Sequence, residues 1–183
     1  MSTSTSTDTS TEVSIRPRRP EDLAPLAEVL AGQQGHTGYP QRWPLPFPVE
    51  EFLHRPAQLR AWVAELDGAV VGHVAVAAVQ PGQMATVWMA GTGRPLAELA
   101  EVSVLFVDHA ITGRGVGAAL LREAVGFIRD SGRTPVLDVV QETQNALRLY
   151  ERNGWQVVGE TRPWWLPDAN LPVLLMVLPA AGA

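Results

Sequence analysis

The chain has 183 residues, of which 46% are hydrophobic and 18% are charged, and its formal net charge is −5. This composition is typical of one folded domain and excludes a wholly disordered protein. The chain has no cysteine for disulfides or thiolate chemistry. The net charge argues against nucleic-acid binding, and no apolar run approaches the roughly 20 residues of a membrane span. We therefore expect a cytoplasmic protein without nucleic-acid or membrane partners.

Serine and threonine dominate the N-terminus, where they occupy nine of residues 1–12. This segment has neither the basic start nor the apolar core of an export signal. We expect residues 1–12 to be a disordered leader and residues 13–180 to form a single domain. All 14 basic residues are arginine, so no lysine amine is available as a base or Schiff-base former.

The next part of the chain predicts a strand, a helix and a structured loop. The strand covers residues 13–16, and the helix begins at Pro20 and ends at Gly32. Residues 33–48 contain four prolines and two glycines, which exclude a long regular element, while their aromatic residues supply apolar contact area.

A β-hairpin is expected after a short helix over residues 49–53. Its strands, residues 59–66 and 69–79, flank Asp67-Gly68, a pair that suits the positive φ angles of a tight turn. Residues 80–97 have no clear assignment, because prolines and glycines interrupt an apolar patch there.

The C-terminal part predicts alternating strands and helices. The strands cover residues 101–107, 135–140, 155–160 and 173–178, and the helices cover residues 115–131 and 145–152. The connection between the first two of these strands is long enough for parallel pairing. We expect an α/β fold of the α+β type, with a mixed, mostly antiparallel sheet of six to seven strands and about four helices on its two faces.

A glycine-rich turn precedes the helix over residues 115–131 and reads Thr112-Gly113-Arg114-Gly115-Val116-Gly117-Ala118. Its three alternating glycines leave backbone N–H groups uncovered at the N-terminus of a helix, which predicts a phosphate ligand. The turn lacks the Gly-Lys-Ser/Thr ending of a Walker A loop. It also has Ala118 where a dinucleotide fingerprint needs glycine, although Asp138 on the next predicted strand loosely resembles the ribose-binding acid of that fingerprint.

The residues around this turn resemble the GNAT family of acetyl-CoA-dependent N-acyltransferases. The resemblance is carried by EVSVLFVDHAITGRGVGAALL, residues 101–121, and by NALRLYERNGW, residues 145–155. It implies a sheet whose central parallel strand pair is splayed to hold coenzyme A. The family has Gln or Arg where this chain has Thr112, which leaves the backbone of residues 113–118 to bind the pyrophosphate.

The resemblance also implies which other residues bind acetyl-CoA. Three strand residues next to a local bulge would pair their backbone with the pantetheine arm as an added strand does, one helix residue would hydrogen-bond the arm, and two arginines would approach the phosphates. The strand residues are Leu105, Phe106 and Val107, the helix residue is Asn145, and the arginines are Arg148 and Arg152. Their alternative interpretations are a buried strand, a helix N-cap and solvated arginines.

Acyl transfer from a thioester to an amine needs a base for the amine and an acid for the departing thiolate. By the resemblance, Tyr150 is the acid. Glu101 is the candidate base, because it lies eleven positions before Thr112, the spacing of the catalytic glutamate in the histone-acetylating branch. Strand alternation predicts that Glu101 shares one face with Leu105 and Val107.

Several alternatives for the chemistry stay open. Ordered water could serve as the base, and His109, His73 and His36 are rivals of Glu101. A backbone N–H of residues 105–107 would bind the oxyanion. No two histidines have metal-ligand spacing, so we expect no metal.

The acceptor is expected against the segments of residues 38–47 and 162–172. Their aromatic residues would form an apolar or cation-accepting wall, and these are Tyr39, Trp43, Trp164 and Trp165. The acidic net charge mildly favours a cationic substrate, which we expect to be a primary amine of a small molecule or peptide. A homodimer is compatible with these expectations. The alternatives are a non-catalytic acyl-CoA sensor and a nucleotide-binding module.

Overall fold

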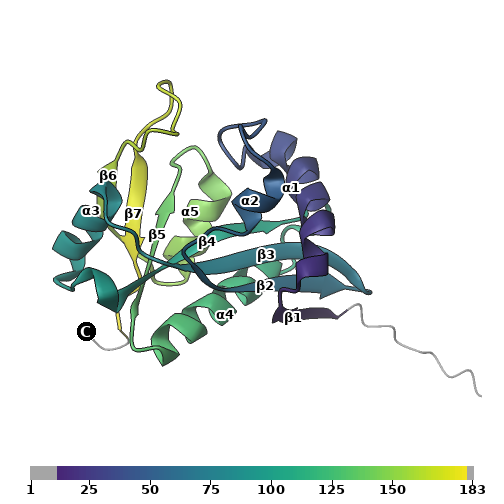
Figure 1. Ribbon diagram of the computed structural model, residues 1–183, viewed down its shortest axis with the longest axis horizontal. Coiled ribbons are helices and arrows are strands. Elements are labelled where there is room, and N and C mark those ends of the chain that lie inside the picture. The colour runs from purple at the N-terminus through teal and green to yellow at the C-terminus, as the bar shows by residue number, and fades with distance from the viewer. Residues whose placement is uncertain (1–11, 181–183) are drawn as a thin grey trace, which may run out of the picture.

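The computed structural model describes residues 12–180, so the leader predicted for residues 1–12 lies outside the described residues except for Glu12. The seven described strands form one sheet in the order β1-β2-β3-β4-β5-β7-β6 (Figure 1). Only β4 and β5 pair in parallel, which confirms the predicted mixed sheet. The strands are β1 (Val13–Pro17), β2 (Gln58–Leu66), β3 (Ala69–Ala78), β4 (Leu99–Val107), β5 (Thr134–Val139), β6 (Gln156–Thr161) and β7 (Val173–Val177).

Helices cover both faces of the sheet. One face packs against α4 (Val116–Asp130) and α5 (Gln144–Arg152). The other face packs against α1 (Leu23–Thr37), α2 (Val49–Leu53) and α3 (Gln83–Thr92). Three short 3-10 turns complete the elements: η1 (Pro20–Asp22), η2 (Leu96–Glu98) and η3 (His109–Ile111). Within residues 12–180, no helix has the length and apolarity needed to cross a membrane.

The helix predicted over residues 115–131 is present as α4. Val116, Leu120, Ala124 and Ile128 recur at helical spacing and are buried against the sheet, which is the pattern of a helix with one apolar face. Gly132, with a φ of 75°, follows the end of the helix.

The predicted end of α1 at Gly32 is wrong. The helix continues to Thr37 and ends at Gly38, whose φ of 72° is left-handed. The continuation depends on Gln33, a buried residue whose side-chain amide donates to the carbonyls of Leu30 and Tyr39. This anchoring offsets the roughly 1 kcal/mol that a glycine costs inside a helix.

Residues 80–97, left unassigned from the sequence, contain α3. Its Trp88 is 1% exposed in the core under β5 and β7. A Cβ at Gly91 would lie 2.5 Å from Val158, and one at Gly159 would lie 2.5 Å from Val87. The two glycines therefore allow α3 to approach β6 closely, as Figure 1 shows.

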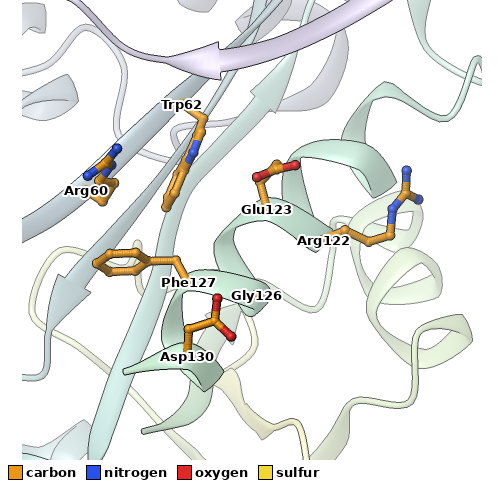
Figure 2. A pocket seen from close by; sticks show the side chains of 7 residues that line it. All are labelled: Arg60, Trp62, Arg122, Glu123, Gly126, Phe127 and Asp130. Atoms are coloured by element: carbon orange, nitrogen blue, oxygen red, sulfur yellow. The ribbon is translucent and has the colours of Figure 1, made fainter. Parts of the chain in front are cut away.

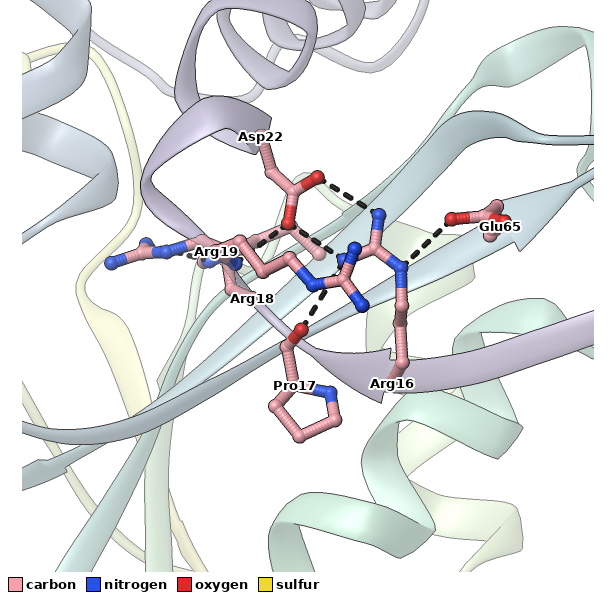
Figure 3. A network of polar contacts seen from close by, with 7 residues as sticks. Arg16, Pro17, Arg18, Arg19, Asp22 and Glu65 are labelled. Atoms are coloured by element: carbon pink, nitrogen blue, oxygen red, sulfur yellow. Dashed lines mark hydrogen bonds and ion pairs between the residues drawn. The ribbon is translucent and has the colours of Figure 1, made fainter.

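An arginine network fixes the first strand to the start of α1 (Figure 3). Arg16 donates to both carboxylate oxygens of Asp22, at 2.8 and 2.9 Å, and to Glu65 at 2.8 Å. Asp22 also accepts from the backbone N–H of Arg19 at 2.7 Å. The Arg16 guanidinium lowers the pKa of Asp22, so this buried carboxylate is charged and paired.

Candidate active site

The parallel strands β4 and β5 pair only over three residues each. Leu99 lies opposite Thr134, Ala100 opposite Pro135 and Glu101 opposite Val136, and the pairing ends there. Beyond Glu101, the backbone groups of β4 on this side have no partner in β5. This divergence confirms the splayed central pair.

A bulge interrupts β4 shortly after this point. His73 pairs with Phe106 and Ala75 with Ser103, so two residues of β4 face a single residue of β3. One of the two is Val104, whose φ of 51° is unusual for a β-branched residue. The local bulge expected from the resemblance is therefore present.

The bulge overturns the predicted alternation along β4. Ala100 and Val102 pack on the α4 face, and Leu105 and Val107 pack there as well. One residue of the bulge has shifted the phase of the strand, so Glu101 faces the opposite side. The prediction that Glu101 shares a face with Leu105 and Val107 is wrong.

Glu101 instead shares its face with Asp138 of β5. Glu101 is in register with Val136, and residues two apart on a strand point to the same side. Burial raises the pKa of Glu101 to about 8, and the adjacent Asp138 carboxyl adds to the rise. Burial likewise raises the pKa of Asp138. Two neighbouring carboxyls in a poorly solvated site hold a proton near neutral pH.

One cation and one phenol lie near this pair of acids. The charge of Arg55 opposes the rise in both carboxyl pKa values, and its guanidinium lies 4.8 Å from the centre of the Phe52 ring. Tyr39 lies 5.9 Å from the same ring. Burial raises the pKa of Tyr39, and the charges of Asp138 and Glu101 contribute.

Tyr150 lies on α5 and packs in the core on the α4 face of the sheet. Its ring is buried and packs edge-on against Trp155 at 6.0 Å. Burial raises the pKa of Tyr150, with further contributions from Tyr39 and Asp138. Its hydroxyl therefore stays protonated across the neutral range, as a proton donor requires.

The glycine-rich turn has the backbone that an anion site needs. Gly113 and Gly115 have φ values of 83° and 77°, and Gly115 is the N-cap of α4. The first N–H groups of a helix have no carbonyl one turn earlier, so those of residues 115–118 are available to a ligand. A Cβ would meet nothing within 4 Å at either glycine, so the turn is open.

The other side chains predicted to bind acetyl-CoA lie in their own turn or at the surface. The Thr112 hydroxyl donates to the His109 carbonyl at 2.8 Å and so faces its own turn. The N-cap of α5 is Thr143, which makes Asn145 an exposed residue of the first turn and not the cap. Arg148 and Arg152 are exposed on α5.

The two predicted acceptor segments lie together on one side of the molecule (Figure 1), where Asn170 donates to Gln41 at 3.0 Å. Their aromatic residues differ in burial. Tyr39 and Trp43 pack against the core under α1, and Trp165 packs against the core under α3. Trp164 is 83% exposed and joins neither core.

The three histidines considered as alternatives to Glu101 as the base have different surroundings. His109 stacks on His36 at the surface, with ring centroids 3.6 Å apart. His73 is buried and hydrogen-bonded on both ring nitrogens. Across residues 12–180, no three His, Asp or Glu side chains are grouped to hold a metal ion.

A separate open pocket of about 410 Å³ lies between β2 and the second half of α4 (Figure 2). Its walls carry two arginines and two acids around an edge-on aromatic pair, Trp62 and Phe127. None of the predicted site residues lines it.

Sequence reasoning missed Asp138 as a partner of Glu101, and it missed Arg55. A signal for Asp138 was present, because it is the one acid in the apolar strand PVLDVV, and an acid on a buried strand needs a functional or pairing reason. Arg55 lies in the connection between α2 and β2, where no pattern distinguishes it from a solvated arginine.

The chain is similar to known proteins in sequence and in fold. The family model described as the acetyltransferase (GNAT) family matches residues 28–155. N-acetyltransferase 8 of Mus musculus is 34% identical over 124 residues, which is 66% of this chain and 50% of that protein. The N-alpha-acetyltransferase RimI of Mycobacterium tuberculosis is 42% identical over 65 residues, 36% of this chain and 40% of that protein. The chain thus spans about half or less of the length of these curated relatives.

Solved structures show the same fold. Arabidopsis thaliana NAA60 in complex with acetyl-CoA superposes with a TM-score of 0.68 at 19% identity, covering 91% of this chain and 97% of that one. A GNAT-family acetyltransferase from Streptococcus pneumoniae gives 0.67 at 23% identity, covering 92% and 100%.

Proposed function

The chain belongs to the GNAT family of acetyltransferases, and on that premise we propose that it transfers the acetyl group of acetyl-CoA to a primary amine of a small molecule or peptide. The transfer is direct, with both substrates bound at once. The observation that carries this proposal is the pair of adjacent carboxyls, Glu101 and Asp138, where the pairing of β4 and β5 ends.

The residues present fit acetyl-CoA. The backbone N–H groups of residues 113–118 bind the pyrophosphate at the start of α4, and the unpaired edge of β4 from Leu105 to Val107 binds the amides of the pantetheine arm. Asn145 hydrogen-bonds the arm, and Arg148 and Arg152 approach the phosphates. When bound, acetyl-CoA supplies an acyl group activated as a thioester.

Glu101 is the base in this proposal. An amine attacks only when it is neutral, so the ammonium must lose a proton to a group whose pKa lies near the working pH. A carboxylate with a pKa of about 8 takes up that proton far better than an ordinary glutamate. Asp138 keeps the pKa of Glu101 high, and Arg55 limits the rise.

Tyr150 is the acid. The departing thiolate needs a hydrogen-bond donor, and the buried phenol of Tyr150, whose pKa is raised, stays protonated and donates to the sulfur. Tyr39, Trp43 and Trp165 form the apolar wall beside the acceptor, and Trp164 extends it at the surface. The similarity to RimI of Mycobacterium tuberculosis, an N-alpha-acetyltransferase, supports an amine acceptor.

A thiol-release assay with acetyl-CoA and a panel of amines of varied charge and size tests the proposal. The wild-type chain should release coenzyme A with at least one amine. Tyr150→Phe should lower kcat about 100-fold while leaving acetyl-CoA affinity within about twofold. Tight acetyl-CoA binding with no turnover on any amine would favour the sensor alternative, and preferential stabilisation by ATP or NAD would favour the nucleotide-binding module.

A further inference from the structure

The bulge in β4 creates a carbonyl that needs a partner outside the regular ladder. Where two residues of β4 face one of β3, the ladder cannot pair both. The carbonyl of Val104 lies 2.8 Å from Nδ1 of His73. A carbonyl only accepts, so Nδ1 carries the hydrogen and donates it to Val104.

A second contact orients the His73 ring. Its Nε2 lies 3.1 Å from a guanidinium nitrogen of Arg18, which can only donate. The two contacts together define one neutral tautomer. His73 is 0% exposed, and burial lowers its pKa to about 3, so the ring keeps this tautomer across the neutral range.

Arg18 is itself held by several partners. Its guanidinium donates to the carbonyl of Leu53 and to Oε1 of Gln58, and it lies 2.7 Å from Nδ1 of His54. A chain of polar contacts therefore crosses the sheet from the end of β1, past α2, to the bulge in β4. Networks of this kind fix one geometry when every member is satisfied.

The geometry held in this way is strained. Val104 has a left-handed φ of 51°, and its side chain is packed in the core with Leu26, Leu30 and Phe52. A β-branched residue adopts this conformation only where its surroundings enforce it. The same bulge sets the direction of the backbone from Leu105 to Val107, the segment that the proposed function assigns to acetyl-CoA.

We propose that His73, oriented by Arg18, is a positioning residue that fixes the Val104 bulge and thereby aligns the β4 backbone for the acetyl donor. The inference rests on the proposed function. His73 does not touch the donor in this proposal. It acts through the carbonyl of Val104, so its loss lowers affinity for acetyl-CoA and not affinity for the amine.

Three substitutions at residue 73 separate the hydrogen bond from bulk and polarity. His73→Asn places its side-chain N–H near the position of Nδ1 and keeps the donation to Val104. His73→Gln carries its N–H one bond farther out, and His73→Leu has none. We expect His73→Leu and His73→Gln to weaken acetyl-CoA binding about tenfold, and His73→Asn to stay within about threefold of wild type.

Calorimetric titration of the full chain with acetyl-CoA gives the affinities, and steady-state kinetics separates KM for acetyl-CoA from KM for the amine. Ile128→Ala is the matched control, because it removes a buried side chain of α4 far along the helix from the bulge. It should lower the melting temperature without changing acetyl-CoA affinity.

The outcomes are distinct. A wild-type chain that does not bind acetyl-CoA would contradict the proposed function before any variant is made. Wild-type binding together with equal affinity in His73→Leu, or with no advantage of His73→Asn over His73→Gln, would overturn the positioning role alone. If His73→Leu fails to fold, the comparison of the Asn and Gln variants still decides.

Discussion

Glu101 on β4 and Asp138 on β5 project from the same face of the sheet, just where the two parallel strands cease to pair. Burial raises both carboxyl pKa values, the Asp138 carboxyl raises that of Glu101 further, and Arg55 is the cation that opposes the rise. A pair of this kind retains a proton that ordinary surface acids have lost. The pH dependence of the reaction is therefore a direct readout of this site.

Replacing Asp138 should shift the pH profile toward acid. Asp138→Asn removes a neighbouring negative charge, so the pKa of Glu101 falls toward its ordinary value. We expect the rising limb of log(kcat/KM), measured from pH 5 to 9, to move to lower pH by roughly one pH unit or more. Asp130→Asn on the exposed side of α4 is the control. Identical profiles for Asp138→Asn and wild type would remove Asp138 from the site.

Replacing Arg55 should shift the same limb the opposite way. Arg55 lowers the pKa of Glu101, so Arg55→Gln raises it and leaves less ionised base at pH 7. The limb should move to higher pH, and activity at pH 7 should fall more than activity at pH 9. Arg60→Gln on the exposed part of β2 should change neither. A shift of the Arg55→Gln profile toward acid would contradict the assigned charge arrangement.

The left-handed N-cap of α4 should tolerate no side chain. Gly115→Ala forces a Cβ onto a φ of 77°, which costs about 1–2 kcal/mol of folding free energy and distorts the N–H groups assigned to the pyrophosphate. We expect weaker acetyl-CoA binding by titration. Gly126→Ala in the interior of the same helix has open space and should stabilise the chain by about 0.5–1 kcal/mol with unchanged affinity. Equal affinities for both variants would place the pyrophosphate elsewhere.

Breaking the Arg16–Asp22 pair should destabilise the fold in a pH-dependent way. Asp22→Asn should lower the free energy of unfolding by about 3 kcal/mol at pH 7, because it leaves Arg16 without its principal partner. The pKa of Asp22 is lowered in the folded state. Its stabilisation is therefore complete above the unfolded pKa and is lost as pH falls through the folded one.

Urea unfolding at pH 7 and at pH 3 measures this difference, which should shrink at the lower pH. Glu98→Gln breaks the exposed Arg94–Glu98 pair and should cost less than about 1 kcal/mol. A difference between Asp22→Asn and wild type that is constant with pH would contradict the ionised pair.

The sequence predicted those parts of the site that depend on local signals. The glycines of residues 113–117 set the turn, and the apolar spacing from Val116 to Ile128 set the helix behind it. The role of Tyr150 stays a prediction that rests on its motif. Each of these depends on a few consecutive residues whose conformation is determined locally.

What the sequence did not predict depends on contacts between distant segments. Val104 is β-branched and disfavours a positive φ, so nothing local marks it as part of a bulge. Regular alternation therefore placed Glu101 and Leu105 on the same face of the strand. Gly32 is an ordinary helix stop until Gln33 is anchored by the chain that follows. Asp138 becomes a partner of Glu101 only through the register of β4 and β5.

The rate of coenzyme A release by Glu101→Gln, compared with wild type from pH 6 to 9 on the same amine, tests the central claim most directly. Wild-type kcat/KM should rise with pH and level off above about 8. Glu101→Gln should be slower by roughly 100-fold or more and should lack that limb. A Glu101→Gln variant with the wild-type rate and the wild-type pH profile would contradict the assignment of Glu101 as the base.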